Sequence, residues 1–364
     1  MNARASLLAG APALRDWVRA GGRPERAPLA WRQRLNWHAG WSQILQAQQR
    51  QRFSGTQPLQ QPVFVLGLWR SGTTLLHERL ALLPGLQGPQ TWQCFNPHTF
   101  LLTGAPAPNS RAVQRPMDDG QVRPDTAQED EFALLLQGAP SLYRGFIDPR
   151  RLAALADEHF GSAPADAAAP MVTGDWQARW LYFLAGVEHQ GQGRRLVLKS
   201  PNHTLRAPLL ASLFPQAPRV WIGRPLEQVW HSNLRMWRSM FDTYGLWPCP
   251  PNALEDFLQR CIQRYIEVLE QALADAPGLH CWLDFDDLFE YPVETLKSLS
   301  GHGLVTAERC SDARLQAIVE QVPARAPRTQ EVSLPPALQA QARVIGELHA
   351  QARVRWPWRA GWSA

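Results

Sequence analysis

The chain of 364 residues is 45% hydrophobic, which is enough to form a substantial buried core. Its five cysteines are scattered and form no CxxC pair, so the composition argues against a disulfide framework and a zinc site and favours a reducing, cytoplasmic location. The net charge of +5 suits an anionic small ligand. The sequence has no run of five basic residues of the kind that would indicate a nucleic-acid partner. It also has no run of about 18 apolar residues, which a membrane-spanning helix would need.

The first 60 residues are polar and rich in arginine and glutamine, and we expect them to form a helical N-terminal extension. The apolar stretch near their start is broken by Pro12 and followed by Arg15 and Asp16, so we expect no secretion signal. We expect one α/β domain over residues 61–305. A helical C-terminal extension over residues 306–364 should pack on the same domain and ends in the sequence RWPWRAGW.

Short apolar runs alternate with helical segments through the middle of the chain. Helices are predicted over residues 74–83 and 174–190, near Thr126, and after Pro225. This alternation over about 220 residues is typical of an α/β fold, here a P-loop-type, doubly wound parallel sheet flanked by helices. The predicted strands are residues 62–66, 194–199, 219–223 and 280–285.

A candidate phosphate-binding loop follows the first strand. Residues 67–74 read GLWRSGTT directly after PVFVL. Two glycines permit a tight turn in which successive backbone N–H groups point inward as an anion nest, and the next helix adds the positive end of its dipole. The pattern therefore favours a phosphate-binding loop over a plain strand–turn–helix connection.

Thr73 stands where a Walker loop has its lysine. That lysine reaches the β- and γ-phosphates of a nucleotide, and the next hydroxyl holds Mg²⁺. The only cation of this loop is Arg70, whose guanidinium can grip a terminal oxyanion group without a metal. We therefore disfavour a nucleotide triphosphatase. We also expect no metal site, because Asp286 and Asp287 lack a third ligand at suitable spacing.

Further polar residues follow two other strands. Lys199 and Arg224 end strands, at the edge where open parallel sheets bind ligands. Ser232 lies about two turns along the helix after Arg224, so the two can clamp a second phosphate. Each residue alone is explained more simply as a strand-end charge or a helix-surface hydroxyl, but together, downstream of the loop, they favour a binding site.

These motifs resemble those of the sulfotransferases that use 3′-phosphoadenosine-5′-phosphosulfate (PAPS), especially the bacterial branch and the tyrosylprotein-type enzymes. The resemblance covers roughly residues 62–300 and implies transfer of a sulfuryl group from PAPS to an acceptor hydroxyl or amine, without a metal. It is carried by PVFVLGLWRSGTTLLHERL, by LVLKSPNHTLRAPLLASLFPQAPRVWIGRPLEQVWHS and, more weakly, by LDFDDLFEYPVETL.

The resemblance also implies roles for single residues. Arg224 and Ser232 would hold the 3′-phosphate of PAPS, and Lys199 matches a lysine near the leaving phosphate. Arg70 and Lys199 would stabilise the charge that grows on the leaving oxygen. The 5′-phosphosulfate end would lie against five loop residues: Arg70, Ser71, Gly72, Thr73 and Thr74.

The general base departs from the family pattern. Many relatives have a glutamate where this chain has Gln93, and a neutral amide cannot take a proton. His98 is the first substitute, because imidazole titrates near neutral pH.

Glu131 and Glu129 rank next as bases, because their segment AQEDEFALLL resembles an acidic segment of the bacterial branch. Thr126 and Glu129 also form a capping-box pattern, which is a structural reading of Glu129. His203 ranks last, since it can instead cap a helix or orient a lysine. His77 is expected to pack or face solvent, away from the phosphate.

Two rival functions stay open. One is a P-loop small-molecule kinase with a degenerate loop, and the other is a sulfotransferase-like protein that binds nucleotide without activity. The expected acceptor is a small molecule with a lipid, phenol, carbohydrate or natural-product hydroxyl. The sequence does not determine the oligomeric state, and the aromatic tail can dock on the core or on a second subunit.

Overall fold

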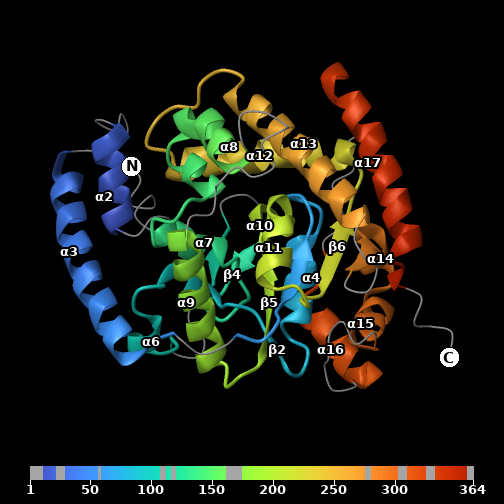
Figure 1. Cartoon of the computed structure of the whole chain (residues 1–364), viewed down its shortest axis with the longest axis horizontal. Helices are drawn as coiled ribbons and strands as arrows, with labels where there is room; N and C mark the ends of the chain where they lie inside the picture. The colour runs from blue at the N-terminus through green and yellow to red at the C-terminus, as the bar shows by residue number, and fades with distance from the viewer. Residues whose placement is uncertain are drawn as a thin grey trace. The chain divides into compact units, whose positions relative to one another are not determined.

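The computed structural model describes residues 11–21, 29–55, 59–106, 112–115, 120–160, 174–274, 280–301, 310–324 and 333–358. The chain folds into two compact units, each assembled from separate stretches (Figure 1). The first unit comprises Met1–Leu59, Gln90–Gln192 and Leu234–Arg260, and the second comprises Gln60–Pro89, Gly193–Asn233 and Cys261–Ala364. The division at residues 60 and 305 stays a prediction.

The second unit contains a parallel sheet with the strand order β2-β5-β1-β6-β7. From the central strand β1 the chain builds β2 and β5 on one side and then β6 and β7 on the other, which confirms the expected doubly wound α/β sheet. The strands are β1 (Val63–Leu66), β2 (Leu86–Gln87), β5 (Arg195–Lys199), β6 (Arg219–Gly223) and β7 (His280–Asp284).

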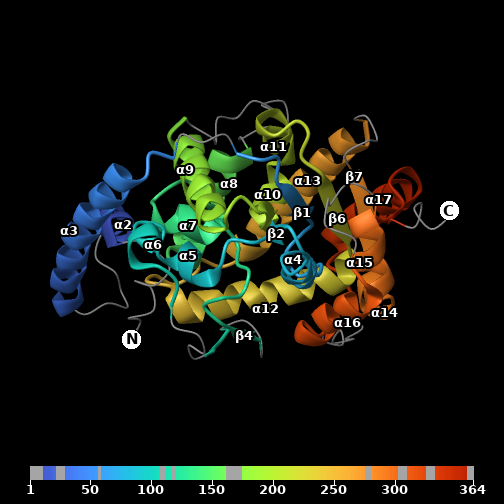
Figure 2. The ribbon, with the colours of Figure 1, turned by 90° about the horizontal axis from the view of Figure 1, so that it is seen from below.

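Helices cover both faces of this sheet, with α4 and α15 on one side of the strands and α10 and α11 on the other (Figure 2). The helices of the second unit are α4 (Thr73–Leu80), α10 (Pro201–Leu205), α11 (Ala207–Leu213), α14 (Phe285–Glu290), α15 (Pro292–Gly301), α16 (Asp312–Gln321) and α17 (Pro336–Arg355). Two longer helices, α12 (Leu226–Tyr244) and α13 (Ala253–Ala274), run from one unit into the other. The predicted helix 74–83 is thus the shorter α4, and the segment after Lys199 forms two helices.

Alternate strand residues build two different layers of core. Val63, Val65 and Ile222 face the aliphatic layer, which α4 and α14–α16 complete with leucines. Trp221 of β6 and its partner Trp282 on β7 face the opposite, aromatic layer. There the Trp221 Nε1 donates to His280 Nδ1 at 2.9 Å. The buried alternation explains why these strands are continuous apolar runs in the sequence.

Two buried histidines lie in the aromatic layer. His280 stacks on Trp356 with ring centroids 4.5 Å apart, and the Nε2 of His349 lies 3.0 Å from the Tyr265 hydroxyl. Burial is the main cause that lowers the pKa of each imidazole to about 4. Both rings are therefore neutral in the folded protein near pH 7.

The described part of the aromatic tail docks on the core of the second unit. The backbone N–H of Trp282 donates to the carbonyl of Trp356, and the Nε1 of Trp358 donates to Asp287 at 2.9 Å. Asp287 therefore has a structural role, as expected for its segment. The remaining residues of the tail, 359–362, lie outside the described residues.

Among its described residues the first unit is mostly helical and has one short antiparallel pair of strands. Its aromatic core includes Trp176 and Trp180, which are both fully buried. The long helix α9 confirms the prediction for residues 174–190. In the described part of the chain no helix is both long and apolar enough to cross a membrane. The elements are α2 (Ala11–Gly21), α3 (Leu29–Arg52), α5 (Thr91–Phe95), α6 (Phe100–Thr103), β3 (Val113–Gln114), β4 (Gln121–Val122), α7 (Glu131–Leu136), the 3-10 helices Leu142–Phe146 and Pro149–Arg151, α8 (Leu152–Phe160) and α9 (Gly174–Gln190).

Candidate active site

The phosphate loop connects β1 to α4 in a conformation that depends on its glycines. Gly72 caps α4 with φ of 102°, and a Cβ there would lie 2.5 Å from the Phe285 ring. A Cβ on Gly67 would lie 2.6 Å from the carbonyl oxygen of Ile222. Arg70 also has a positive φ of 70°, which is uncommon for a residue with a side chain. The backbone of the loop is thus held in a tight, strained turn.

The start of α4 offers backbone donors rather than side-chain caps. No side chain caps this helix, and the first helical hydrogen bond is donated by the N–H of Leu76 to the carbonyl of Gly72. The N–H groups of Thr73 and Thr74 therefore point to where an anion binds at a helix N-terminus. The Ser71 hydroxyl is used within the loop, where it donates to the carbonyl of Leu68 at 2.7 Å.

Lys199 reaches this loop from the neighbouring strand. It ends β5, is only 2% exposed, and its Nζ donates to the Thr74 hydroxyl at 3.1 Å. The chain contains only one other lysine, Lys297, against 35 arginines. A buried ammonium group here supplies the cation that the loop lacks at Thr73, which is itself buried.

Arg70 and Arg224 are joined around the same loop. The Nε of Arg70 donates to the hydroxyl of Ser232 at 3.0 Å. The Nη1 of Arg224 lies 3.4 Å from the carbonyl of Arg70, and its guanidinium stacks 4.5 Å from the Phe285 ring centre. All the cofactor-binding residues predicted from the sequence thus belong to one unit, and the structure brings these three together.

Electrostatics at Arg224 reflect its half-buried position. Burial is the largest cause that lowers the pKa of Arg224, and Arg70 adds to it, while the carboxylate of Asp286 opposes both. The guanidinium stays charged at neutral pH, because an arginine keeps its proton in proteins. The site is therefore strongly cationic.

Two residues that position the loop escaped the sequence analysis. The Thr204 hydroxyl accepts from the N–H of Gly67 at 2.7 Å and donates to its carbonyl at 2.9 Å. The Nδ2 of Asn233 donates to the carbonyl of Trp69 at 3.0 Å. Each lies close to a predicted residue, since Thr204 follows the KSPNH sequence and Asn233 follows Ser232. Proximity in sequence was the only signal available.

Two histidines of the second unit have structural contacts. The Nε2 of His77 lies 2.9 Å from the carbonyl of Val197, so this buried histidine packs against the sheet as expected. His203 is fully buried and contacts the Phe64 ring edge-on. Among the described residues, no group of three or more His, Cys, Asp or Glu could hold a metal ion.

The three highest-ranked candidate bases, His98, Glu131 and Glu129, lie in the first unit, which is described by itself. Gln93, at the position of the family glutamate, is buried and caps α5: its Oε1 accepts from the N–H of Gln90 at 2.7 Å. Its Nε2 donates to Gln190 at 2.8 Å. The amide is fully used in hydrogen bonds that hold the local structure.

His98 is half-buried and faces a carbonyl group. Its Nε2 lies 3.3 Å from the carbonyl of Leu136, and its Nδ1 is buried. Burial is the main cause that lowers the pKa of His98. The imidazole is neutral at pH 7, as a base must be, but the nitrogen that does not face the carbonyl lies in the interior.

The expected helix start near Thr126 is wrong. Helix α7 begins at Glu131 with Asp130 as its N-cap, because the Thr126 hydroxyl instead donates to the carbonyl of Arg123 at 2.8 Å. Glu129 is therefore outside the helix, and the capping-box interpretation of this residue is wrong. Its carboxylate accepts from the Tyr143 hydroxyl at 2.5 Å.

The two acidic neighbours of Glu129 are fully buried. Asp130 accepts from the Nε1 of Trp180 at 2.6 Å, and Glu131 opens α7 with no exposed surface. Glu129 is only half-buried. Among these three carboxylates, Glu129 is thus the one that a substrate can approach.

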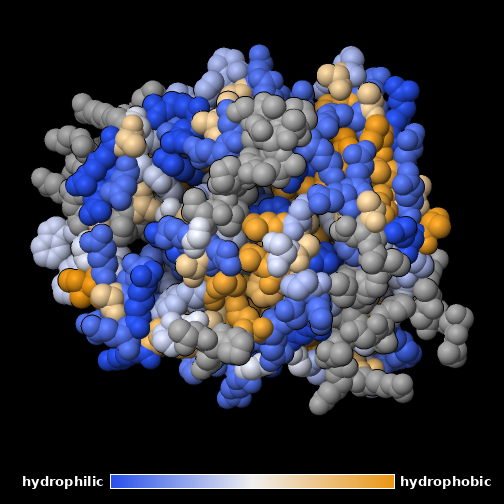
Figure 3. Space-filling model, viewed as in Figure 1, coloured by the Kyte–Doolittle hydropathy of each residue, from blue (hydrophilic) through white to orange (hydrophobic). Residues whose placement is uncertain are grey.

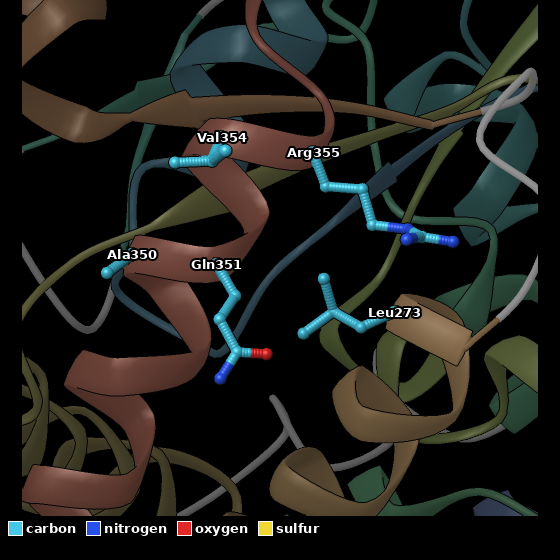
Figure 4. A pocket seen from close by; sticks show the side chains of 5 residues that line it. All are labelled: Leu273, Ala350, Gln351, Val354 and Arg355. Atoms are coloured by element: carbon cyan, nitrogen blue, oxygen red, sulfur yellow. The ribbon is translucent and has the colours of Figure 1, made fainter.

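Helices α13 and α17 form a shallow groove whose lining residues are far in sequence from the candidate bases. Figure 4 shows Leu273 from α13 opposite Gln351, Val354 and Arg355 from α17. Apolar side chains gather along α17 in the space-filling view (Figure 3). The groove has a volume of about 480 Å³, and none of its lining residues belongs to the predicted site.

The known proteins that this chain resembles are all sulfotransferases. A model of the sulfotransferase family matches residues 62–302. Two curated proteins, the omega-hydroxy-beta-dihydromenaquinone-9 sulfotransferases Stf3 of Mycobacterium bovis and Mycobacterium tuberculosis, are each 29% identical over 249 residues, which is 66% of this chain. The match spans 62% of the length of those relatives.

Two crystal structures share the fold. Sulfotransferase STF1 from Mycobacterium tuberculosis superposes with a TM-score of 0.60 at 17% identity, over 93% of this chain and 91% of that one. Sulfotransferase STF9 from Mycobacterium avium gives 0.63 at 19% identity, over 90% of this chain and 86% of that one. At such identities the superpositions establish the α/β fold alone.

Proposed function

Since the chain belongs to the sulfotransferase family, we propose that it transfers a sulfuryl group from PAPS to the hydroxyl of a small-molecule acceptor. The observation that carries this proposal is the cationic phosphate loop. Lys199 contacts Thr74 from a neighbouring strand, while Thr73 takes the Walker lysine position. Such a loop suits a phosphosulfate, which has no γ-phosphate to be held.

The residues present fit the donor. Backbone donors at the start of α4 and the cations Arg70 and Lys199 suit its 5′-phosphosulfate end. Arg224 offers a guanidinium to the 3′-phosphate, with Ser232 beside it on α12. The flat face of Arg224 is held by Phe285, so little entropy is lost when the guanidinium binds.

The chemistry requires that an acceptor oxygen form a bond to sulfur while the bond from sulfur to the 5′-phosphate oxygen breaks. Lys199 and the N–H groups of α4 stabilise the negative charge that grows on that phosphate oxygen. A carboxylate takes the acceptor proton. We assign this role to Glu129, because it is half-buried, lies outside α7 and is held by Tyr143, whereas Glu131 is fully buried.

The names of the curated relatives support one class of acceptor. They give an omega-hydroxy-beta-dihydromenaquinone-9, which is a hydroxylated menaquinone. We infer that the acceptor of this chain is also an apolar molecule with one reactive hydroxyl.

Calorimetric titration with adenosine 3′,5′-bisphosphate, and separately with ATP and Mg²⁺, tests the donor site. We expect micromolar binding of the bisphosphate that persists with a chelator and is lost in Arg224→Ala. Arg235→Ala, which changes an exposed arginine on α12, is the matched control. Binding of ATP only with Mg²⁺, and none of the bisphosphate, would replace the sulfotransferase proposal with a kinase.

An activity assay separates the remaining rival. A protein that binds the bisphosphate but transfers no sulfuryl group to any hydroxylated quinol, phenol or sterol, even with excess PAPS, would be a nucleotide-binding relative without activity.

A further inference from the structure

The positive charge of the chain is concentrated at its N-terminus. The first 60 residues contain nine arginines and two acidic residues, a net charge of +7, whereas the whole chain carries +5. The remaining 304 residues thus sum to −2. The 24 residues of α3 include four arginines and no acidic residue. Such asymmetry indicates a partner with negative charge that is met by the N-terminal helices.

Helix α3 also presents an exposed apolar stripe. Trp37, Trp41 and Ile44 are 71%, 56% and 52% exposed. Their spacing of four and three residues places them on one face of the helix. Two indoles left in water forfeit a large hydrophobic gain, since one tryptophan can bury roughly 200 Å². Exposed tryptophans at helical spacing therefore point to a surface that covers them.

The opposite face of α3 is fixed within the first unit. Ala39 and Gln49 are buried. The Gln49 amide donates to the carbonyl of Pro97 and accepts from the N–H of Leu101, both at 3.0 Å. The helix also lies beside α2 in both ribbon views (Figures 1 and 2). These contacts prevent the helix from rolling its tryptophans inward.

We propose that α3 binds the surface of an anionic lipid bilayer. Trp37, Trp41 and Ile44 insert at the boundary between headgroups and acyl chains, where indole rings are favoured. Arg52, which is exposed and lies near the same face as the three apolar side chains, contacts a lipid phosphate. The helix lies along the interface and does not span it.

The apolar stripe favours lipid over nucleic acid. A protein surface that binds nucleic acid needs cations at its centre. The centre of the exposed face of α3 instead holds two tryptophans and an isoleucine. A second copy of the chain would bring the same positive charge against itself, which is unfavourable. An anionic bilayer complements both the apolar stripe and the charge.

Co-sedimentation of the full chain with vesicles tests the proposal. The probes are phosphatidylcholine vesicles with and without phosphatidylglycerol. We expect binding that requires phosphatidylglycerol, weakens with salt, and falls about tenfold or more in the double variant Trp37→Ser, Trp41→Ser. The matched control is Val354→Ser on α17, another exposed apolar residue at 84% exposure, which should bind like the wild type.

Other measurements keep the test decisive. Unchanged calorimetric binding of adenosine 3′,5′-bisphosphate by the double variant shows that it is folded, and this readout is independent of lipid. The proposal is overturned if the wild type does not bind anionic vesicles, or if the double variant binds them equally well. It is also overturned if sedimentation velocity shows a dimer that only the tryptophan substitutions dissociate, or if the stripe binds single-stranded RNA in preference to lipid.

Discussion

The two units of this protein hold their candidate site residues in place by different means. In the second unit, strand ends carry the groups: Lys199 follows β5 and Arg224 follows β6, and both meet the loop after β1. In the first unit, Glu129 is placed by a contact with Tyr143 across 14 residues of irregular chain and helix. The first arrangement follows from sheet topology, and the second depends on packing.

This difference determines how readily each site is changed. The parallel sheet determines where its strands end. A substitution in the loop after β1 therefore leaves that loop beside the ends of the same neighbouring strands. A carboxylate oriented by a single tyrosine can be exchanged for another acid nearby. Gln93, at the position where many relatives have a glutamate, is a neutral amide that caps α5, whereas the loop in the second unit resembles the family pattern.

The largest effect is expected from the first unit. Glu129→Gln should lower kcat by about 10²–10⁴-fold with little change in bisphosphate affinity, because the amide cannot accept the acceptor proton. Steady-state kinetics and calorimetry measure the two quantities. Full activity in Glu129→Gln, with a large loss in His98→Gln or Glu131→Gln, would move the base to the residue that fails.

Removing the cation at the sheet edge should cost nearly as much. Lys199→Met keeps the length of the side chain but removes the ammonium group, and kcat should fall about 10²–10³-fold. The control is Lys297→Met, the only other lysine of the chain and an exposed one. Equal activity of the two variants would show that Lys199 serves only to hold Thr74.

Acid should act on the second unit through its buried histidines. The pKa of His280 and of His349 is about 4 in the folded protein and near 6.5 in the unfolded chain, so the unfolded state takes up protons first as pH falls. Their contribution to stability is complete above pH 6.5 and is lost as pH falls to 4. At pH 5 the free energy of unfolding should drop by about 2 kcal/mol for each histidine.

Urea unfolding at pH 7 and pH 5 measures this loss. His280→Gln should remove about half of the difference between the two pH values. A free energy of unfolding that is the same at both pH values would mean that the two rings can be protonated without disrupting the aromatic layer.

The smallest effect should come from the orienting tyrosine. Tyr143→Phe removes one hydroxyl donor to Glu129, so kcat should fall about tenfold. Steady-state kinetics measures kcat, and calorimetry with adenosine 3′,5′-bisphosphate shows that the variant is folded. An unchanged kcat in Tyr143→Phe would show that the tyrosine does not orient the base.

The sequence was informative where function depends on local backbone. Strand β1, the glycine loop and the ends of β5 and β6 were predicted because apolar runs and glycines determine them over a few residues. Thr204 and Asn233 were missed, because a hydroxyl that bridges both backbone groups of Gly67 has no sequence pattern. The order of the five strands also comes from the structure rather than from the run of elements.

The sequence predicts the first unit less well than the second, for a physical reason. The capping pattern at Thr126 and Glu129 was present, but competing hydrogen bonds to Arg123 and Tyr143 used both side chains. Local patterns state what a segment can form on its own, and tertiary contacts then choose among the options. The exposed apolar stripe of α3 also cannot be predicted from the sequence, because only the structure shows which face of this helix is buried.

The chain passes from one unit to the other five times, and two of these passages lie inside α12 and α13. Neither unit is therefore a single stretch of the gene, and no one cut by a protease could release either of them. A fragment that ends before residue 193 would lack two of the three stretches of the second unit and three of the five strands of its sheet. The chain must be synthesised past β7 (His280–Asp284) before the sheet can be completed. Chain order, rather than size, thus makes late folding unavoidable for the phosphate-binding unit.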